Sequence, residues 1–152
     1  EILTSFLETK KWPPNWSSLT FMFQKEVAER ILAKENTKNY GRLSILSNWR
    51  TKPKKLFNIE PYSFKPSPKI TSTLINFQPI NNFSEVNDIN NFLNIVKLTF
   101  NQRRKMVRKS LKLIHEDIDN ILVYCDIKPT DRAENISIEK YCKLSNIIYK
   151  KN

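Results

Sequence analysis

The feature that most constrains the fold of this chain is a change of pattern near Pro79. Before it, three short segments have the alternating apolar or the β-branched and aromatic character of strands: Leu19–Gln24, Lys55–Glu60 and Ser72–Gln78. After it, apolar residues recur at helical spacing almost to the C-terminus. The sequence therefore predicts a strand-bearing region over residues 1–80 and a small helical domain over residues 81–152.

Helices are expected in both regions. In the first, KEVAERILA follows the first strand with helical spacing, and Tyr40 to Trp49 repeats apolar residues every three positions until Lys52 and Pro53 end the pattern. In the second, Asn81–Asn87 reads as a linker and Ser137 as an N-cap. The helices predicted there are Ile89–Leu98, Asn101–Ile114, Ile118–Tyr124 and Ile138–Tyr149.

The stretch FNQRRKMVRKSLK, residues 100–112, concentrates positive charge and contains no acidic residue. On a helix its apolar residues share one side with Ile114, while the basic residues Arg104, Lys105, Arg108, Lys109 and Lys112 share the other. Such a face suits a polyanionic partner. The alternative is an ordinary solvated helix face. Arg103 lies toward the apolar side, so it either sits in an exposed first turn or is held there for a purpose.

Composition narrows the class of protein. The chain has 152 residues, and 26 Lys and Arg against 15 Asp and Glu give a formal net charge of +11, which favours nucleic acid or an anionic surface as partner. No apolar run approaches the roughly 20 residues that span a bilayer, so we expect no membrane association and a cytoplasmic protein. The chain opens on Glu1 in mid-pattern, which we interpret as part of a longer protein.

Several kinds of site are not indicated. Gly41 is the single glycine, so no Gly-rich phosphate loop and no nucleotide cofactor site is predicted within these residues. Cys125 and Cys142 lack the spacing of a zinc site and are expected to be reduced packing residues, and no metal site is predicted. The single histidine, His115, has no neighbouring nucleophile and is a poor candidate for a catalytic base.

The turn FKPSPK, residues 64–69, is a second candidate for contact with a nucleic acid. Pro66 and Pro68 restrict the backbone, so the turn is stiff and holds Phe64 in a defined place. An aromatic side chain beside Lys65 and Lys69 suits stacking on a base whose phosphates are close by. The alternative is a packed turn without a ligand.

Five phrases carry a resemblance to a known family. FMFQKEVAERI, YGRLSI, FKPSPKITSTLINFQP, FNQRRKMVRKSLK and RAENISIEKYCKLSN occur in an order and at spacings that resemble the KsgA (RsmA) family of small-subunit rRNA adenine N6,N6-dimethyltransferases. The resemblance runs from Glu1 nearly to the C-terminus. The FNQRRK and RAENIS phrases favour this family over the related erythromycin-resistance methylases.

The resemblance implies a fold and a cofactor. The chain would be the C-terminal portion of the enzyme: a three-stranded α/β remnant of a Rossmann-like sheet, followed by an all-α domain. The middle strand would be Ser72–Gln78, and Leu19–Gln24 would have an open edge through which the isolated chain self-associates. Family members bind S-adenosylmethionine in the N-terminal half, ahead of the segment that matches this chain, so no cofactor residue is expected here.

The resemblance also implies roles for individual residues. Phe64 would stack on the flipped target adenine, with Lys65 and Lys69 beside it. The segment matching FNQRRK would bind ribosomal RNA through Arg103, Arg104 and Lys105, with Arg108 and Lys109 as neighbours. Gln24 and Glu26 are interpreted as structural, and Arg132 and Glu134 as a local salt bridge that fixes the turn before the last helix. The three tryptophans, Trp12, Trp16 and Trp49, are interpreted as packing residues.

Two functions of different classes remain open. The complete protein would be an enzyme that transfers methyl groups from S-adenosylmethionine to N6 of two adjacent adenines near the 3′ end of small-subunit (16S) rRNA. The alternative is a non-catalytic basic module that binds rRNA on the small ribosomal subunit. For these 152 residues alone, binding without methyl transfer is expected.

Overall fold

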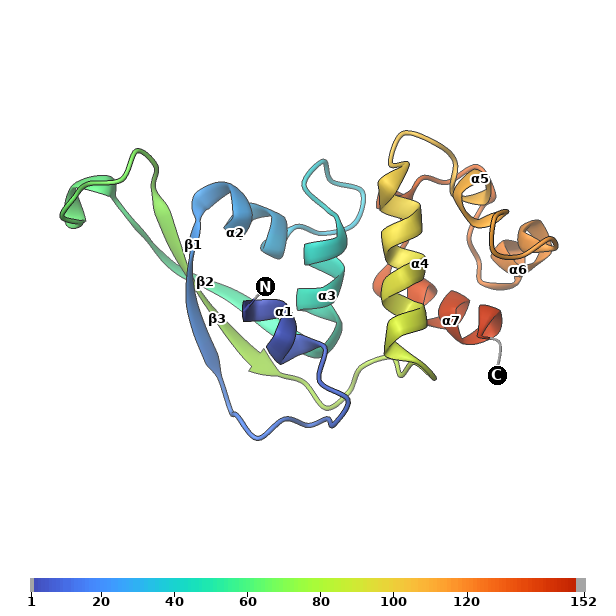
Figure 1. Ribbon diagram of the computed structural model, residues 1–152, viewed down its shortest axis with the longest axis horizontal. Coiled ribbons are helices and arrows are strands. Elements are labelled where there is room, and N and C mark those ends of the chain that lie inside the picture. Colours follow the sequence, from blue (N-terminus) through green and yellow to red (C-terminus); the bar gives the residue numbers. More distant parts are fainter. Residues whose placement is uncertain (1, 150–152) are drawn as a thin grey trace. The chain divides into compact units, whose positions relative to one another are not determined.

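The computed structural model describes residues 2–149 and divides them into two compact units (Figure 1). The first unit runs to Lys34 and resumes over Leu43–Phe83, and the second contains Glu35–Arg42 and the chain from Ser84 onward. The sequence predicted one boundary, after residue 80. It did not predict that Glu35–Arg42 joins the second unit. Each unit is described by itself.

The first unit is built on a three-stranded antiparallel sheet. The strands are β1 (Leu19–Gln24), β2 (Thr51–Ile59) and β3 (Ser72–Pro79), in the order β1-β3-β2. This is the predicted order, with β3 in the middle. Because β1 pairs only with β3 among the described residues, its other edge keeps unpaired backbone groups. Self-association of the isolated chain through this edge stays a prediction.

The helices of this unit are α1 (Ile2–Leu7), α2 (Lys25–Leu32) and α3 (Arg42–Arg50). Alternation along β3 buries Thr73, Ile75 and Phe77 on one face, and α2 packs against all three strands. The opposite face carries Met22 and Phe57, each paired in register with Leu74 and each about half exposed (50% and 55%). The sheet therefore has one well-covered face.

The start of β2 differs from the prediction. We expected Pro53 to end a helix and a strand to begin at Lys55, but α3 ends at Arg50 and β2 begins directly at Thr51. Pro53 lies inside the strand. Proline has no N–H to donate, and an edge strand needs hydrogen bonds on one side only, so the position tolerates it.

Arg50 is the buried charge of the first unit, with 6% of its surface exposed. Its guanidinium carbon lies 3.9 Å from the centroid of Trp49, 5.2 Å from that of Trp12 and 5.3 Å from that of Phe83. Its Nη1 also donates to the backbone oxygen of Thr9, at 2.7 Å. The aromatic faces stabilise this buried cation.

Replacing Arg50 with alanine should lower the free energy of unfolding of the first unit by about 2 kcal/mol, because the ring contacts and the bond to Thr9 are lost together. Trp12, Trp16 and Trp49 all belong to this unit, so urea unfolding followed by tryptophan fluorescence reports on it. Lys10→Ala, at an exposed position of the same unit, is the control and should change stability by less than about 0.5 kcal/mol. Equal losses in both variants would contradict the prediction.

The second unit is helical. Its helices are α4 (Ile89–Asn101), α5 (Val107–Leu111), α6 (Ile118–Tyr124) and α7 (Ile138–Ile148). Asp88 caps α4 by accepting from the Asn91 backbone N–H at 2.8 Å, and Ser137 caps α7 by accepting from the Lys140 N–H, as predicted. Their inward faces form a core in which the following side chains are fully buried: Phe92, Ile95, Leu111, Ile118, Leu122, Tyr141 and Leu144.

The prediction of one helix over Asn101–Ile114 is wrong. The chain leaves α4 at Gln102, and Gln102–Met106 form a loop before α5 begins. Met106 makes an isolated antiparallel β-bridge with Arg132, and the Val107 N–H donates to the Asp131 oxygen at 2.7 Å. These bonds to a distant turn replace the bonds that a continuous helix would have made.

Candidate nucleic-acid interface

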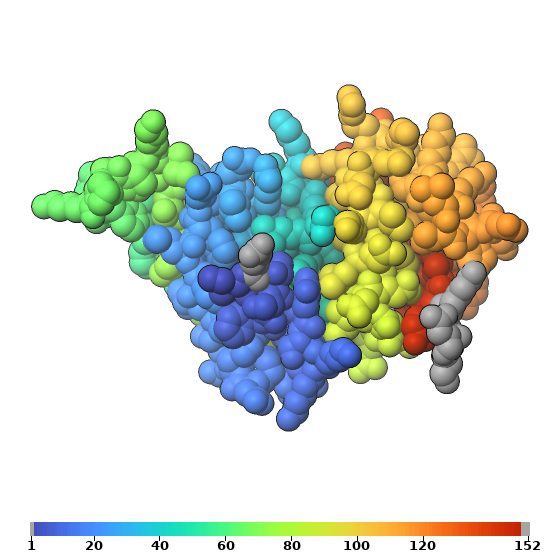
Figure 2. Space-filling view, viewed as in Figure 1, coloured from blue at the N-terminus to red at the C-terminus, as the bar shows by residue number. Residues whose placement is uncertain are grey.

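The turn that carries Phe64 projects from the first unit, where Figure 2 shows it in green. It begins with the short 3-10 helix η1 (Pro61–Ser63) and is closed by several bonds: the Phe64 N–H donates to the Pro61 oxygen at 3.2 Å, and the Ser67 hydroxyl donates to the same oxygen at 2.7 Å. At its base, the Thr71 hydroxyl donates to Glu60 at 3.1 Å. The turn is therefore held by its own hydrogen bonds.

Phe64 is half-buried, whereas Lys65 and Lys69 are exposed. Tyr62, two residues earlier, is 83% exposed. The Phe64 side chain is thus partly covered, and the two lysines place positive charge on the same projection. This arrangement can present a ring face and two ammonium groups to a nucleotide. The prediction that Phe64, Lys65 and Lys69 contact RNA stays a prediction.

A second candidate site is formed by the loop Gln102–Met106 together with α5. We call the following residues the basic surface: Arg104, Lys105, Arg108, Lys109 and Lys112. All are exposed except Arg108, which is half-buried. Val107 and Leu111 are buried beneath them. The predicted division into an apolar side and a basic side thus exists, but a loop and a short helix make it rather than one helix.

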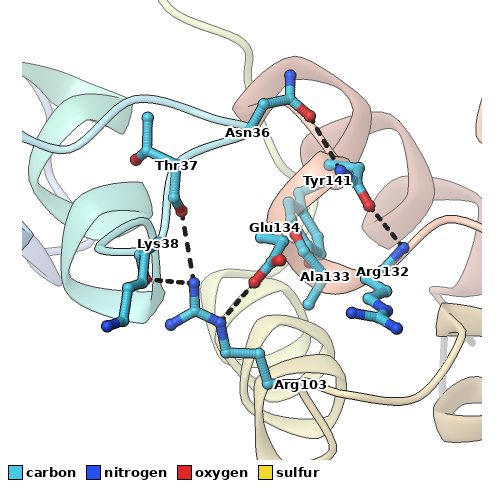
Figure 3. A network of polar contacts seen from close by, with 9 residues as sticks. Asn36, Thr37, Lys38, Arg103, Arg132, Ala133, Glu134 and Tyr141 are labelled. Carbon is cyan, nitrogen blue, oxygen red and sulfur yellow. Dashed lines mark hydrogen bonds and ion pairs between the residues drawn. The ribbon is translucent and has the colours of Figure 1, made fainter.

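Arg103 lies beside the basic surface and has partners within the protein (Figure 3). Its Nε donates to Glu134 Oε2 at 2.6 Å, and its Nη2 donates to the backbone oxygens of Lys38 and Thr37. The side chain is 37% exposed and that of Glu134 28%. These bonds do not test the predicted RNA contact of Arg103. They hold its guanidinium against other parts of the protein, and no such side-chain bonds are described for Arg104 and Lys105.

The salt bridge predicted between Arg132 and Glu134 is wrong. Glu134 pairs with Arg103, 31 residues away, and the Arg132 N–H instead donates to the Asn135 side chain at 2.9 Å. The turn is fixed by this backbone bond and by the 3-10 helix η2 (Ala133–Asn135). The short separation of Arg132 and Glu134 in sequence therefore did not predict the partner of Glu134, because folding brings Arg103 to it instead.

Two buried tyrosines hold the same turn from the inside. The Tyr141 hydroxyl donates to the Ala133 oxygen at 3.0 Å and lies 3.1 Å from the Thr99 hydroxyl, while the Tyr40 hydroxyl donates to the Ile136 oxygen at 3.0 Å. Burial raises the pKa of both tyrosines well above the ordinary value for a phenol, so both stay protonated donors. Glu134 therefore projects from a turn with fixed flanks.

Two further cations lie at or near this turn, and sequence reasoning assigned neither of them to RNA binding. Lys38 is exposed in Glu35–Arg42, whose backbone accepts bonds from Arg103, and Arg132 is exposed opposite Met106 in the β-bridge. No local sequence pattern could have identified Lys38, because folding brings it to Arg103, which lies 65 residues away in sequence. Gln24 is exposed, and Glu26 pairs with Arg30 one turn along α2. The interpretation of Gln24 and Glu26 as structural residues stays a prediction.

The described residues do not fit a site for S-adenosylmethionine. No Asp or Glu is among the buried side chains, and Gly41 lies in a connection before α3 rather than in a Gly-rich loop after a strand. Cys125 and Cys142 are buried, as expected of packing residues. Residues 2–149 contain no group of three or more potential metal ligands. No helix in this range is long and apolar enough to span a membrane.

Comparison with known proteins gives consistent matches over nearly the whole chain. The family model described as "Ribosomal RNA adenine dimethylase" matches residues 6–150. Proteins named "Ribosomal RNA small subunit methyltransferase A" are similar to the chain: 43% identical over 97% of it in Jannaschia sp., and 46% identical over 95% of it in Cereibacter sphaeroides. These matches cover 51% and 52% of the two relatives, so the chain spans about half their length.

Solved structures agree in fold. A crystal structure of a dimethyladenosine transferase from Plasmodium falciparum superposes with a TM-score of 0.76 at 24% identity, covering 94% of this chain and 60% of that one. The 23S rRNA methyltransferase ErmE gives a TM-score of 0.60 at 18% identity, covering 95% of this chain and 58% of that one. The sheet and helices described above are thus a partial methyltransferase fold, and the chain belongs to the ribosomal RNA adenine dimethylase family.

Proposed function

We propose that this chain is the RNA-binding C-terminal portion of an enzyme that dimethylates N6 of two adjacent adenines near the 3′ end of small-subunit (16S) rRNA. The observation that carries the proposal is the match of at least 95% of the chain, at 43–46% identity, to proteins named as small-subunit methyltransferases. Such a substrate places the protein in the cytoplasm, with the small ribosomal subunit as partner.

The residues of this chain have two tasks in the proposal. Phe64 stacks on the target adenine, so that the base is held in one orientation, and Lys65 and Lys69 bind the phosphates beside it. The basic surface binds rRNA and supplies affinity through phosphate contacts. S-adenosylmethionine supplies the methyl group, and in the proposal it is bound by residues outside this chain, since the described residues do not fit it.

A second function applies to the chain by itself. The described residues provide a basic surface but no fit for the methyl donor, which favours a module that binds rRNA without chemistry. The two functions are compatible: the module would be one part of the enzyme.

The test compares the complete protein with this chain alone on small subunits that lack the modification. With S-adenosylmethionine present, mass spectrometry of the rRNA should show two N6,N6-dimethyladenosines per subunit for the complete protein and none for the chain alone. Large subunits should remain unmodified. Modification of large-subunit rRNA, or none of either subunit by the complete protein, would overturn the proposal.

A further inference from the structure

We propose that Arg103 is a positioning residue: it holds the loop Gln102–Met106 in the shape that presents Arg104 and Lys105 to RNA, and it does not itself bind RNA. The inference rests on the proposed function for the identity of the ligand. It separates Arg103 from two neighbours that have the same charge and adjoin it in sequence.

The contacts of Arg103 differ in kind from those of its neighbours. Two of its three guanidinium nitrogens donate to acceptors of the protein: Nε to the Glu134 carboxylate, and Nη2 to two backbone oxygens of Glu35–Arg42 (Figure 3). A planar guanidinium that is bonded along these edges has few donors left for a phosphate. Arg104 and Lys105 are exposed, which leaves their charges available to a ligand.

The loop needs such a hold because its sequence favours another structure. Gln, Arg and Lys are good helix formers, so local preference would continue α4 through Gln102, Arg103 and Arg104. At its C-terminal end the loop is fixed by the β-bridge of Met106 with Arg132 and by the bond from Val107 to Asp131. Nearer the N-terminal end of the loop, Arg103 makes the described side-chain bonds that connect the loop to the rest of the unit.

The acceptor side of this contact is itself well fixed. The Asn36 N–H donates to the Glu134 backbone oxygen at 2.8 Å, and the Asn135 side chain donates to the Asn36 side chain at 3.0 Å. Asn36 adopts a positive φ of 64°, which asparagine tolerates better than most residues. Arg103 thus joins the loop to two segments, Glu35–Arg42 and the turn containing Glu134, that already hold each other.

Two explanations of the Glu134 contact predict opposite effects on RNA binding. Glu134 is an acidic group beside the basic surface, so if it acted only through its charge, its removal would strengthen binding to RNA. If its charge-assisted bond holds Arg103 in place, replacing the carboxylate with a neutral amide must weaken binding, because the hydrogen bond that remains is weaker and the loop is held less firmly. The neutral variant Glu134→Gln therefore distinguishes a structural contact from a field effect.

The experiment measures binding of this chain to small-subunit rRNA at several salt concentrations for Arg103→Gln, Glu134→Gln, the double variant, and Arg104→Gln as matched control. We expect the first two to weaken binding by similar factors, about fivefold to tenfold, and the double variant to be no weaker than either. Arg104→Gln should lower the log–log salt slope by about 0.7 to 0.9, whereas Glu134→Gln should not lower it. Tighter binding by Glu134→Gln, or additive losses in the double variant, would overturn the inference.

Hydrogen exchange separates this inference from the proposed function. The Lys105 N–H donates to Gln102 and the Val107 N–H to Asp131, so both amides report on the shape of the loop without any RNA. Arg103→Gln and Glu134→Gln should speed exchange at both amides, and Arg104→Gln should not. Unchanged exchange in the first two variants overturns the positioning role. The unsubstituted chain could fail to bind rRNA while exchange is still accelerated in the variants. That result would overturn the proposed function and support the positioning role of Arg103.

Discussion

Replacing Arg104, Lys105 and Lys109 together with glutamine should weaken binding of this chain to small-subunit rRNA about 100-fold at 0.15 M salt. Each phosphate contact contributes about 0.7 to 0.9 to the slope of log affinity against log salt, which at that concentration corresponds to roughly a factor of 4 to 5. The three side chains are exposed and project from the loop Gln102–Met106 and from α5, so their loss removes charge without opening the core. Filter binding or fluorescence anisotropy across a salt series measures both the affinity and the slope.

The matched control removes the same charge elsewhere. Lys10, Lys11 and Lys25 are exposed residues of the first unit, and replacing all three with glutamine lowers the formal net charge from +11 by the same amount. If the basic surface is the site, the control should reduce affinity by no more than about threefold, through the long-range field alone. Equal losses in the two triple variants would mean that net charge, rather than this surface, holds the RNA.

Elements whose pattern is local were predicted well from the sequence. β1 and α6 have the bounds that were expected, Leu19–Gln24 and Ile118–Tyr124, because the apolar and aromatic run of one and the helical spacing of the other are read within a single window. Ser137 was identified as a cap from the same short range. The sheet order followed from the family resemblance, not from any pattern in the strands.

The loop within the basic segment could not be predicted in this way. Periodicity placed Val107 and Leu111 on the buried side, and they are buried, yet the helix that was drawn through them does not exist as one piece. The break depends on Asp131, Arg132 and Glu134, which lie in another part of the sequence. Tertiary contacts here prevail over local helix preference, and a pattern of charge contains no information on them.

The same limit explains the contacts of Arg103. Its place toward the apolar side was visible in the sequence, and two explanations were left open. The structure supports the second explanation, that Arg103 is held there for a purpose: its side chain is bonded to Glu134 and to the backbone of Glu35–Arg42. That segment follows α2 and ends at the first residue of α3 in sequence but belongs to the second unit, and only the three-dimensional structure shows this.

Replacing Phe64 with alanine in the complete protein should slow methyl transfer to the small subunit about 30-fold. Stacking of a base on an aromatic side chain contributes about 1 to 3 kcal/mol, and in the proposal this contact orients the target adenine rather than supplying most of the affinity. The basic surface is untouched, so binding to the subunit should change by less than about twofold. Single-turnover transfer and subunit binding, measured on the same preparations, separate the two effects.

Two variants on the same turn make the test specific. Tyr62→Ala removes an aromatic ring that is 83% exposed and two residues from Phe64, and it should leave the transfer rate within about twofold. Phe64→Trp keeps a ring face at the position and should retain most of the rate, which a general loss of turn structure would not allow. If Phe64→Ala transferred methyl groups at the original rate, or lost binding and rate in equal measure, the ring would be a packing residue of the turn. A defect confined to the rate and repaired by tryptophan would place the ring against the reacting base.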